Sequence, residues 1–108
     1  MDPLLRISEE GRIIFLSSDV SDGLHPYWGA YAVSKSALET MVSTYAKETE
    51  RLALQINIVD PGPTSTHLRA GAFPGENQQK IQAPETAAKF VCEVIFNKET
   101  EHGAILKC

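Results

Sequence analysis

A chain of 108 residues, 43% of them hydrophobic, can form one small domain at most, and a domain of this size buries only about 65% of its unfolded surface. Ten basic and fourteen acidic residues give a net charge of −4, without the cluster of lysine or arginine that nucleic-acid binding needs. No stretch approaches the ~20 apolar residues of a membrane helix, and the start at Met1 lacks the pattern of a signal peptide. We therefore expect a cytoplasmic protein that binds neither nucleic acid nor membrane.

The first expected element is a short helix over residues 3–9, which ends at Gly11. Because so short a helix is barely stable alone, we expect the chain to begin inside a larger element. The apolar run Ile13-Ile14-Phe15-Leu16 does not alternate with polar residues. It therefore predicts a strand that is buried on both faces, which is typical of parallel sheets.

A long helix is predicted next, over residues 28–51, after a loop at 21–26 that is rich in glycine, proline and polar residues. Apolar side chains recur in this helix at three- and four-residue spacing and predict one buried stripe. The stripe consists of Tyr31, Leu38, Met41, Val42, Tyr45 and Leu52.

Residues 55–59 predict a second strand, which the following prolines end because proline cannot donate a hydrogen bond to a neighbouring strand. A polar loop is expected over 64–83, and a loop of this length in a compact domain is usually functional or mobile. A further helix is predicted over 84–97, with proline and an acidic residue in its first turn. A last short strand is predicted at 103–106.

Alternating strands and helices predict an α/β fold, namely a partial Rossmann-like doubly wound parallel sheet of about three strands with flanking helices. We expect a single partial domain over residues 1–108. A strand as apolar as 13–16 needs neighbours on both sides, so one edge of the sheet should be exposed unless another chain covers it.

The two cysteines, Cys92 and Cys108, form no Cys-x-x-Cys pair and have no metal-ligand spacing with the three histidines. We expect free thiols, as in a reducing cytoplasm, and no metal site.

Tyr31 and Lys35 lie one helical turn apart and so share a face in the first turns of the long helix. This helix follows the carboxyl end of a buried strand, where ligands bind in open α/β sheets. A lysine cation favours the ionised form of a nearby phenol, which can then exchange a proton with a substrate oxygen. The alternative is an exposed helix lysine beside a core tyrosine.

Ser18 ends the strand before this helix, so its hydroxyl can lie beside Tyr31 and hydrogen-bond a carbonyl or alkoxide oxygen. A turn or a cap is the alternative role for a serine after a strand.

A second group of residues follows the second strand. Gly62 permits close approach of the backbone to a ligand, and backbone N–H groups with the Thr66 hydroxyl can bond a flat amide such as a nicotinamide carboxamide. A plain break between strand and loop is the alternative.

Three motifs resemble consecutive signatures of the short-chain dehydrogenase/reductase family, in the same order and at matching spacing. They are GRIIFLSS at 11–18, YAVSKSAL at 31–38, and INIVDPG at 56–62 followed by Thr66. Together they span essentially the whole chain. The resemblance implies an NAD(P)-dependent oxidoreductase, similar to an oxoacyl reductase, that passes hydride between a nicotinamide and a carbonyl or alcohol.

The resemblance also implies residue roles. Tyr31 would be the catalytic acid/base, Lys35 would favour its ionised form and hold the nicotinamide ribose, and Ser18 would orient the substrate carbonyl. The Thr64 backbone and the Thr66 side chain would contact the carboxamide. The residues expected to bind NAD or NADP are Tyr31, Lys35, Pro61, Gly62, Thr64 and Thr66.

Two further implications concern surfaces. The loop after Thr66 would match the family's substrate lid, and helix 28–51 would match its usual dimer face, which implies a homo-oligomer. Asp60 stands where the family more usually has a small residue.

The family's Thr-Gly-x-x-x-Gly-x-Gly turn, whose helix start takes the pyrophosphate, has no counterpart in this sequence. We therefore expect only the C-terminal catalytic half of the family fold, without the nucleotide-binding half, and we do not expect this chain alone to bind the dinucleotide. One hypothesis is half of a split enzyme, completed by a second chain that supplies the nucleotide-binding half. The other is a non-catalytic remnant of a truncated or split gene, at most an interaction module that uses its exposed sheet edge.

Overall fold

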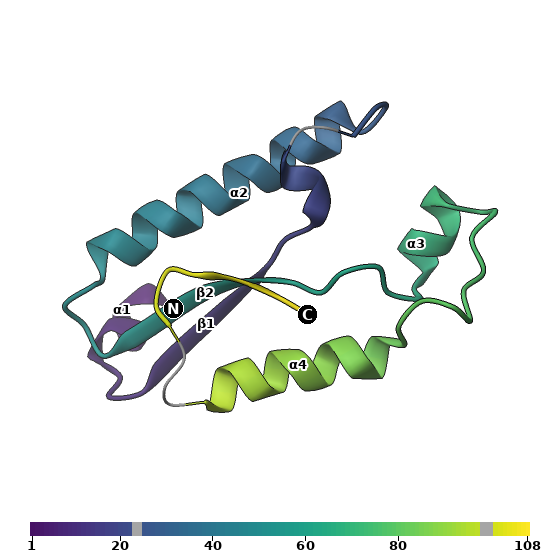
Figure 1. Ribbon diagram of the computed structural model, residues 1–108. Coiled ribbons are helices and arrows are strands. Elements are labelled where there is room, and N and C mark those ends of the chain that lie inside the picture. The colour runs from purple at the N-terminus through teal and green to yellow at the C-terminus, as the bar shows by residue number, and fades with distance from the viewer. Residues whose placement is uncertain (23–24, 98–100) are drawn as a thin grey trace.

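A computed structural model describes residues 1–22, 25–97 and 101–108 (Figure 1). Its parallel sheet contains β1 (Gly11–Leu16), β2 (Leu54–Asp60) and β3 (Ile105–Lys107), in the order β1-β2-β3. The helical elements are α1 (Asp2–Ile7), the 3-10 turn η1 (Asp19–Asp22), α2 (Gly29–Glu48), α3 (His67–Ala72) and α4 (Pro84–Phe96). Helices α2 and α4 lie on opposite sides of the sheet. The predicted partial Rossmann-like α/β fold is confirmed.

The register of the sheet places the ends of β1 and β2 side by side. Gly11 pairs with Leu54 and Leu16 with Val59. The pairing continues one step further, because the Ser17 N–H donates to the Val59 carbonyl at 2.9 Å. The residues that follow both strands therefore start from the same edge of the sheet.

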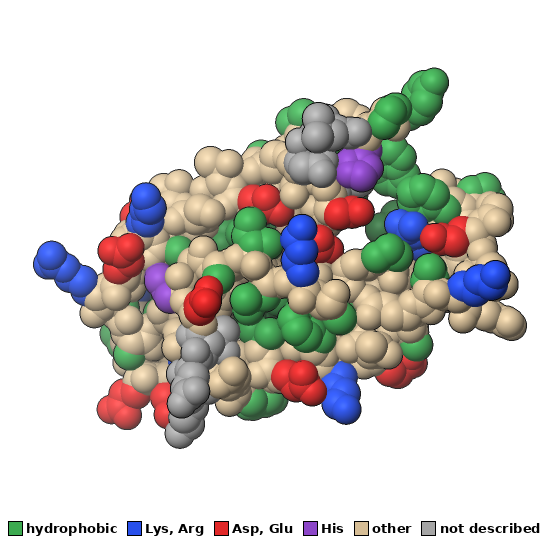
Figure 2. Space-filling view, in the orientation of Figure 1, with side chains coloured by type: hydrophobic (Ala, Val, Ile, Leu, Met, Phe, Trp, Pro, Cys, Tyr) green, Lys and Arg blue, Asp and Glu red, His purple; other side chains and the backbone are tan. Residues whose placement is uncertain are grey.

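The core lies between β2 and α2. Ile56 and Ile58 of β2 are 0% and 1% exposed, and they pack with Val42 and Ala46 of α2. On the opposite side of the sheet, hydrophobic side chains reach the surface between the sheet and α4 (Figure 2). β2 is thus the central strand, covered on both faces.

The prediction that residues 13–16 are buried on both faces is wrong. Only Gly11 of β1 is buried, and Leu16 is 52% exposed. The physical reason is position, because β1 is an edge strand with β2 as its one neighbour in the described sheet. Its apolar sequence suits a central strand better than the edge it occupies.

The predicted stripe of α2 is partly wrong. Val42 is buried, and Leu38 and Tyr45 pack against the core, but Met41 is 60% exposed and Leu52 is 36% exposed. The buried positions include two alanines at 32 and 46. These small side chains let the helix approach the sheet closely, so the buried face lies further round the helix than the large side chains indicated.

The predicted loop at 64–83 contains the short helix α3, which a polar sequence did not indicate. Within the predicted loop at 21–26, Gly23 lies outside the described residues. No helix in the described part of the chain is long and apolar enough to cross a membrane. Among the same residues no group of three or more metal-ligating side chains is found, and both cysteines are free and exposed.

His102 joins three elements through its two ring nitrogens. Nδ1 accepts from the Ile56 N–H at 3.2 Å, and Nε2 donates to the Ala46 carbonyl at 2.7 Å. These bonds require the neutral ring with its hydrogen on Nε2. The side chain therefore ties the approach to β3 to both β2 and the end of α2.

We expect His102→Ala to lower the free energy of unfolding by about 1–3 kcal/mol, because the part-buried Ile56 N–H loses its acceptor and the Ala46 carbonyl is left with its bonds from Thr49. Urea unfolding followed by circular dichroism measures this. The matched control is His67→Ala, which removes an exposed imidazole and should change stability by less than about 0.5 kcal/mol. Equal effects of the two substitutions would contradict the assignment.

Candidate active site

The candidate site forms where β1 and β2 end, next to the first turns of α2. The predicted pair Tyr31 and Lys35 is brought together there, with the Lys35 ammonium 5.8 Å from the centre of the Tyr31 ring. Lys35 also donates to the Leu16 carbonyl at 3.2 Å, which fixes its position against the last residue of β1. The pair therefore faces the carboxyl edge of the sheet, where open α/β folds bind ligands.

The serines after β1 bond to two different carboxylates, Asp19 and Glu39. The Ser18 hydroxyl donates to Asp19 Oδ1 at 3.2 Å. The neighbouring Ser17 is buried and donates to Glu39 Oε1 at 2.5 Å, and Ser21 donates to the same oxygen at 2.9 Å. Glu39 thus anchors the segment after β1 to α2. The expected approach of Ser18 to Tyr31 stays a prediction.

Glu39 was missed by sequence reasoning. It lies on the side of α2 that faces η1 and receives two hydroxyls. Nothing local marks it, because a glutamate in a helix is ordinarily assigned to the solvated face.

The turn after β2 is sharp at the glycine selected from the sequence. Gly62 has a φ of 73°, a conformation that favours glycine. Its N–H donates to Asp60 Oδ1 at 3.0 Å, and its carbonyl accepts from the Thr64 hydroxyl at 3.0 Å. Asp60, which stands where the family more usually has a small residue, therefore has a structural role in the turn.

Gln82 is a second residue that sequence reasoning missed. Its side-chain amide donates to the Pro61 carbonyl and, at 2.9 Å, to Thr64 Oγ1. The backbone of Gln82 also accepts from the Ser65 N–H at 2.9 Å. Gln82 holds the predicted cofactor turn from a position far along the chain, which a local motif cannot reveal.

Thr66 caps helix α3. Its hydroxyl oxygen accepts from the Arg69 N–H at 3.2 Å. A hydroxyl that accepts in a cap can still donate its own hydrogen. The predicted contact between Thr66 and a carboxamide oxygen is therefore compatible with its structural role.

An aromatic contact closes the site on the side of α3. The Phe73 ring stacks on Trp28 with centroids 5.4 Å apart and 14° between the planes, and Trp28 meets Tyr31 edge-on at 5.7 Å. The Arg69 guanidinium lies 3.9 Å from the Phe73 centre. In the space-filling view a hollow opens between the start of α2 and α3 (Figure 2).

Arg69 and Glu76 form the charged pair of this cluster, with N–O distances of 2.7 and 2.9 Å. The hydrogen bonds from Arg69 hold the pKa of the Glu76 carboxyl below its usual value, and those to Glu76 raise the pKa of Arg69. Sequence reasoning missed this cluster. Its one signal was Phe73, the single aromatic residue between Thr64 and Ala83.

The short chain dehydrogenase family matches residues 2–77, which is more than half of the chain. The oxidoreductase YciK of Escherichia coli (strain K12) is 44% identical over 82 residues, which cover 76% of this chain and 32% of YciK. The NADPH-dependent aldehyde reductase-like protein, chloroplastic, of Arabidopsis thaliana is 40% identical over 91 residues, which cover 84% of this chain and 30% of that protein.

Solved structures agree with these relatives. A short chain dehydrogenase from Salmonella enterica subsp. enterica serovar Typhi str. CT18 superposes with a TM-score of 0.90 at 35% identity, over 97% of this chain and 44% of that one. A short chain dehydrogenase from Escherichia coli CFT073 complexed with NADPH gives a TM-score of 0.89 at 35% identity, with the same coverage. The chain thus spans less than half the length of these relatives.

Proposed function

Because this chain belongs to the short-chain dehydrogenase family, we propose that it is the C-terminal catalytic half of an NAD(P)-dependent oxidoreductase that acts on a carbonyl or alcohol in the cytoplasm. The observation that carries the proposal is the Tyr31–Lys35 pair at the carboxyl edge of the sheet, where Lys35 lies 5.8 Å from the Tyr31 ring and is bonded to the end of β1. Relatives named as NADPH-dependent reductases support the cofactor class.

Tyr31 is the group that exchanges a proton with the substrate oxygen. Lys35 places its positive charge 5.8 Å from the centre of the phenol ring, where its bond to the Leu16 carbonyl holds it. The Ser18 hydroxyl, which donates to Asp19 Oδ1 in the structure, would turn its hydrogen to the same substrate oxygen when substrate binds. A nicotinamide held at this site would give the hydride that a carbonyl carbon gains, or accept the hydride that an alcohol carbon loses.

The residues of the chain fit the nicotinamide end of the dinucleotide. Lys35 and Thr66 offer donors for a ribose and a carboxamide, and Gly62 leaves room, since a Cβ placed there would meet no atom nearer than Gln82 Nε2 at 3.9 Å. The Gly62 N–H is already bonded to Asp60 and the Thr64 hydroxyl to the Gly62 carbonyl, so donors for the carboxamide would come from the Thr64 backbone and the Thr66 side chain. No glycine-rich turn for the pyrophosphate is encoded in the sequence.

A second chain that supplies the nucleotide-binding half completes this proposal. β1 has an apolar sequence but is only half buried, with β2 on one side. A parallel strand added to its other edge would cover these side chains and pair the free ladder groups. In this reading residues 1–108 are one partial domain of a two-chain enzyme.

We expect residues 1–108 alone to bind neither NADH nor NADPH measurably, because they contain no glycine-rich turn for the pyrophosphate. Isothermal titration calorimetry with each nucleotide tests this. Tight stoichiometric binding to the isolated chain would contradict it. Purification of the chain from its native cell extract, with mass spectrometry of any stoichiometric partner, tests the second half of the proposal.

The alternative function is that of a non-catalytic remnant, at most an interaction module that uses the β1 edge. The exposed Leu16 favours it, since an uncovered apolar edge promotes association with other chains. The two proposals differ in the partner. A stoichiometric partner with a glycine-rich dinucleotide turn supports the enzyme, and a scarce or aggregated chain without one supports the remnant.

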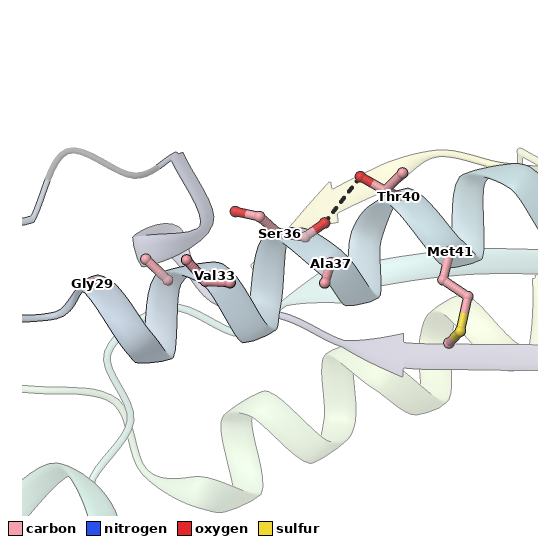
Figure 3. A pocket seen from close by; sticks show the side chains of 7 residues that line it. Gly29, Val33, Ser36, Ala37, Thr40 and Met41 are labelled. Carbon is pink, nitrogen blue, oxygen red and sulfur yellow. Dashed lines mark hydrogen bonds between the residues drawn. The ribbon is translucent and has the colours of Figure 1, made fainter.

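We also propose that α2 mediates contact with a second copy of the assembly, as the family resemblance implies. Its outer face carries an open groove of about 700 Å³ (Figure 3). Val33 and Met41, which border the groove, are 68% and 60% exposed. Two such faces placed together would remove this apolar surface from water, and analytical ultracentrifugation measures whether they do.

A further inference from the structure

The segment between Thr64 and Gln82 leaves the sheet and returns to the same place. Thr64 and Gln82 form a parallel bridge, and the Ser65 N–H donates to the Gln82 carbonyl at 2.9 Å. Residues 66–81 are therefore a closed loop with a fixed base, whose contacts further along decide where it lies over the site.

Phe73 makes the contact that fixes the far part of this loop. Its ring stacks on Trp28 at 5.4 Å, while the Arg69 guanidinium lies 3.9 Å from its centre. Arg69 is held in turn by both oxygens of Glu76, at 2.7 and 2.9 Å. Three side chains of the loop thus support one another around the contact of Phe73 with Trp28 at the start of α2.

Trp28 carries that contact to Tyr31. It is the N-cap residue of α2, three positions before Tyr31, so the two side chains lie on neighbouring parts of one helix face. Their rings meet edge-on at 5.7 Å and 72°. Lys35, one helical turn after Tyr31, is already bonded to the Leu16 carbonyl at the end of β1. The phenol ring therefore lies between one fixed partner and one that depends on the loop.

We infer that Trp28 is a positioning residue, which transmits the position of the loop to Tyr31 through its stack with Phe73. This inference rests on the proposed function of Tyr31. Displacing a reacting group by about 1 Å can cost up to 100-fold in rate. A loop that stacks on Trp28 would therefore hold the Tyr31 hydroxyl where it meets the substrate oxygen, and a loop that leaves Trp28 would release it.

The first test uses the chain by itself. Trp28 is the single tryptophan, so intrinsic fluorescence reports on it alone. We expect Phe73→Leu to shift its emission to longer wavelength and to increase quenching by acrylamide. With isotope-labelled tyrosine, the nuclear magnetic resonance signal of the Tyr31 ring should also shift in this variant, because Phe73 contacts Trp28 and Trp28 contacts Tyr31. The variant Tyr31→Phe identifies the Tyr31 signal.

Phe96→Leu is the matched control, because it makes the same substitution of phenylalanine by leucine at a residue that is 80% exposed at the end of α4. It should leave the tryptophan emission and the Tyr31 signal unchanged, with circular dichroism showing the same helix content in both variants. A Tyr31 signal that does not respond to Phe73→Leu, in a folded variant, would overturn the inference. When Trp28→Leu is already present, adding Phe73→Leu should no longer shift the Tyr31 signal.

A second measurement separates this inference from the proposed function. In an active two-chain enzyme, Trp28→Leu should lower kcat by about 10- to 100-fold with little change in KM for NADPH, and Trp28→Phe should restore most of it. If Tyr31→Phe is inactive while Trp28→Leu has full turnover, this inference alone fails. If Tyr31→Phe has full turnover, the proposed function fails, whatever the spectra show.

Discussion

Tyr31→Phe should lower kcat of the enzyme formed with a nucleotide-binding partner by about 100- to 10,000-fold, the usual contribution of a general acid–base group. The substitution removes one oxygen and leaves the ring, so the edge-on contact with Trp28 and the closeness to Lys35 are kept. Only the hydroxyl, with its exchangeable proton, is lost. Steady-state turnover with NADPH and a carbonyl substrate, followed by absorbance of the reduced nicotinamide, measures the effect.

Tyr27→Phe provides the matched control. Tyr27 is fully exposed and four positions before Tyr31 in the sequence, so the same oxygen is removed outside the site. It should leave kcat within about twofold, as expected of an exposed residue without a role. Turnover that survives unchanged in Tyr31→Phe would remove this residue from the reaction.

Ile56→Ala should lower the free energy of unfolding by about 2–5 kcal/mol, the usual cost of truncating a buried isoleucine. Ile56 is 0% exposed and lies in the central strand, between Val42 and Ala46 of α2 and the rest of the core. The total free energy of unfolding of native proteins is about 5–15 kcal/mol. A small domain with an open sheet edge lies at the low end, so we expect this variant to be largely unfolded at physiological temperature.

Ile7→Ala removes the same atoms from a side chain that is 79% exposed, at the end of α1. Its cost should stay below about 0.5 kcal/mol. Urea titration of both variants, monitored by circular dichroism, compares them. Similar midpoints for the two variants would mean that the β2–α2 interface is not the core of the folded chain.

The elements with local signals were predictable from the sequence. β2 is apolar and is followed by a proline, and α4 begins at a proline. The spacing of Tyr31 and Lys35 placed both side chains on one face of the helix, which agrees with the closeness of Lys35 to the Tyr31 ring and with its bond to Leu16. The strand order β1-β2-β3 follows the order of the chain, as is usual for successive parallel strands joined by helices.

The remaining features depend on partners that are distant in the sequence. The burial of β1 was overestimated because an apolar run does not reveal whether a strand has one neighbour or two. The stack of Phe73 on Trp28 and the bonds of Gln82 to the turn after β2 each join segments that no local pattern relates. Helix α3 has only six residues, so whether it forms depends on the Thr66 cap and on these distant contacts.

The open edge of β1 has a consequence for symmetry. Two copies related by a twofold axis can join such edges only with their strands antiparallel, which would interrupt a sheet whose described pairs are all parallel. Copies that added to one another in parallel would need a head-to-tail contact, and such a contact closes into a ring or continues as a filament. A fully parallel sheet of finite size that covers the β1 edge therefore requires a strand of different sequence beside β1.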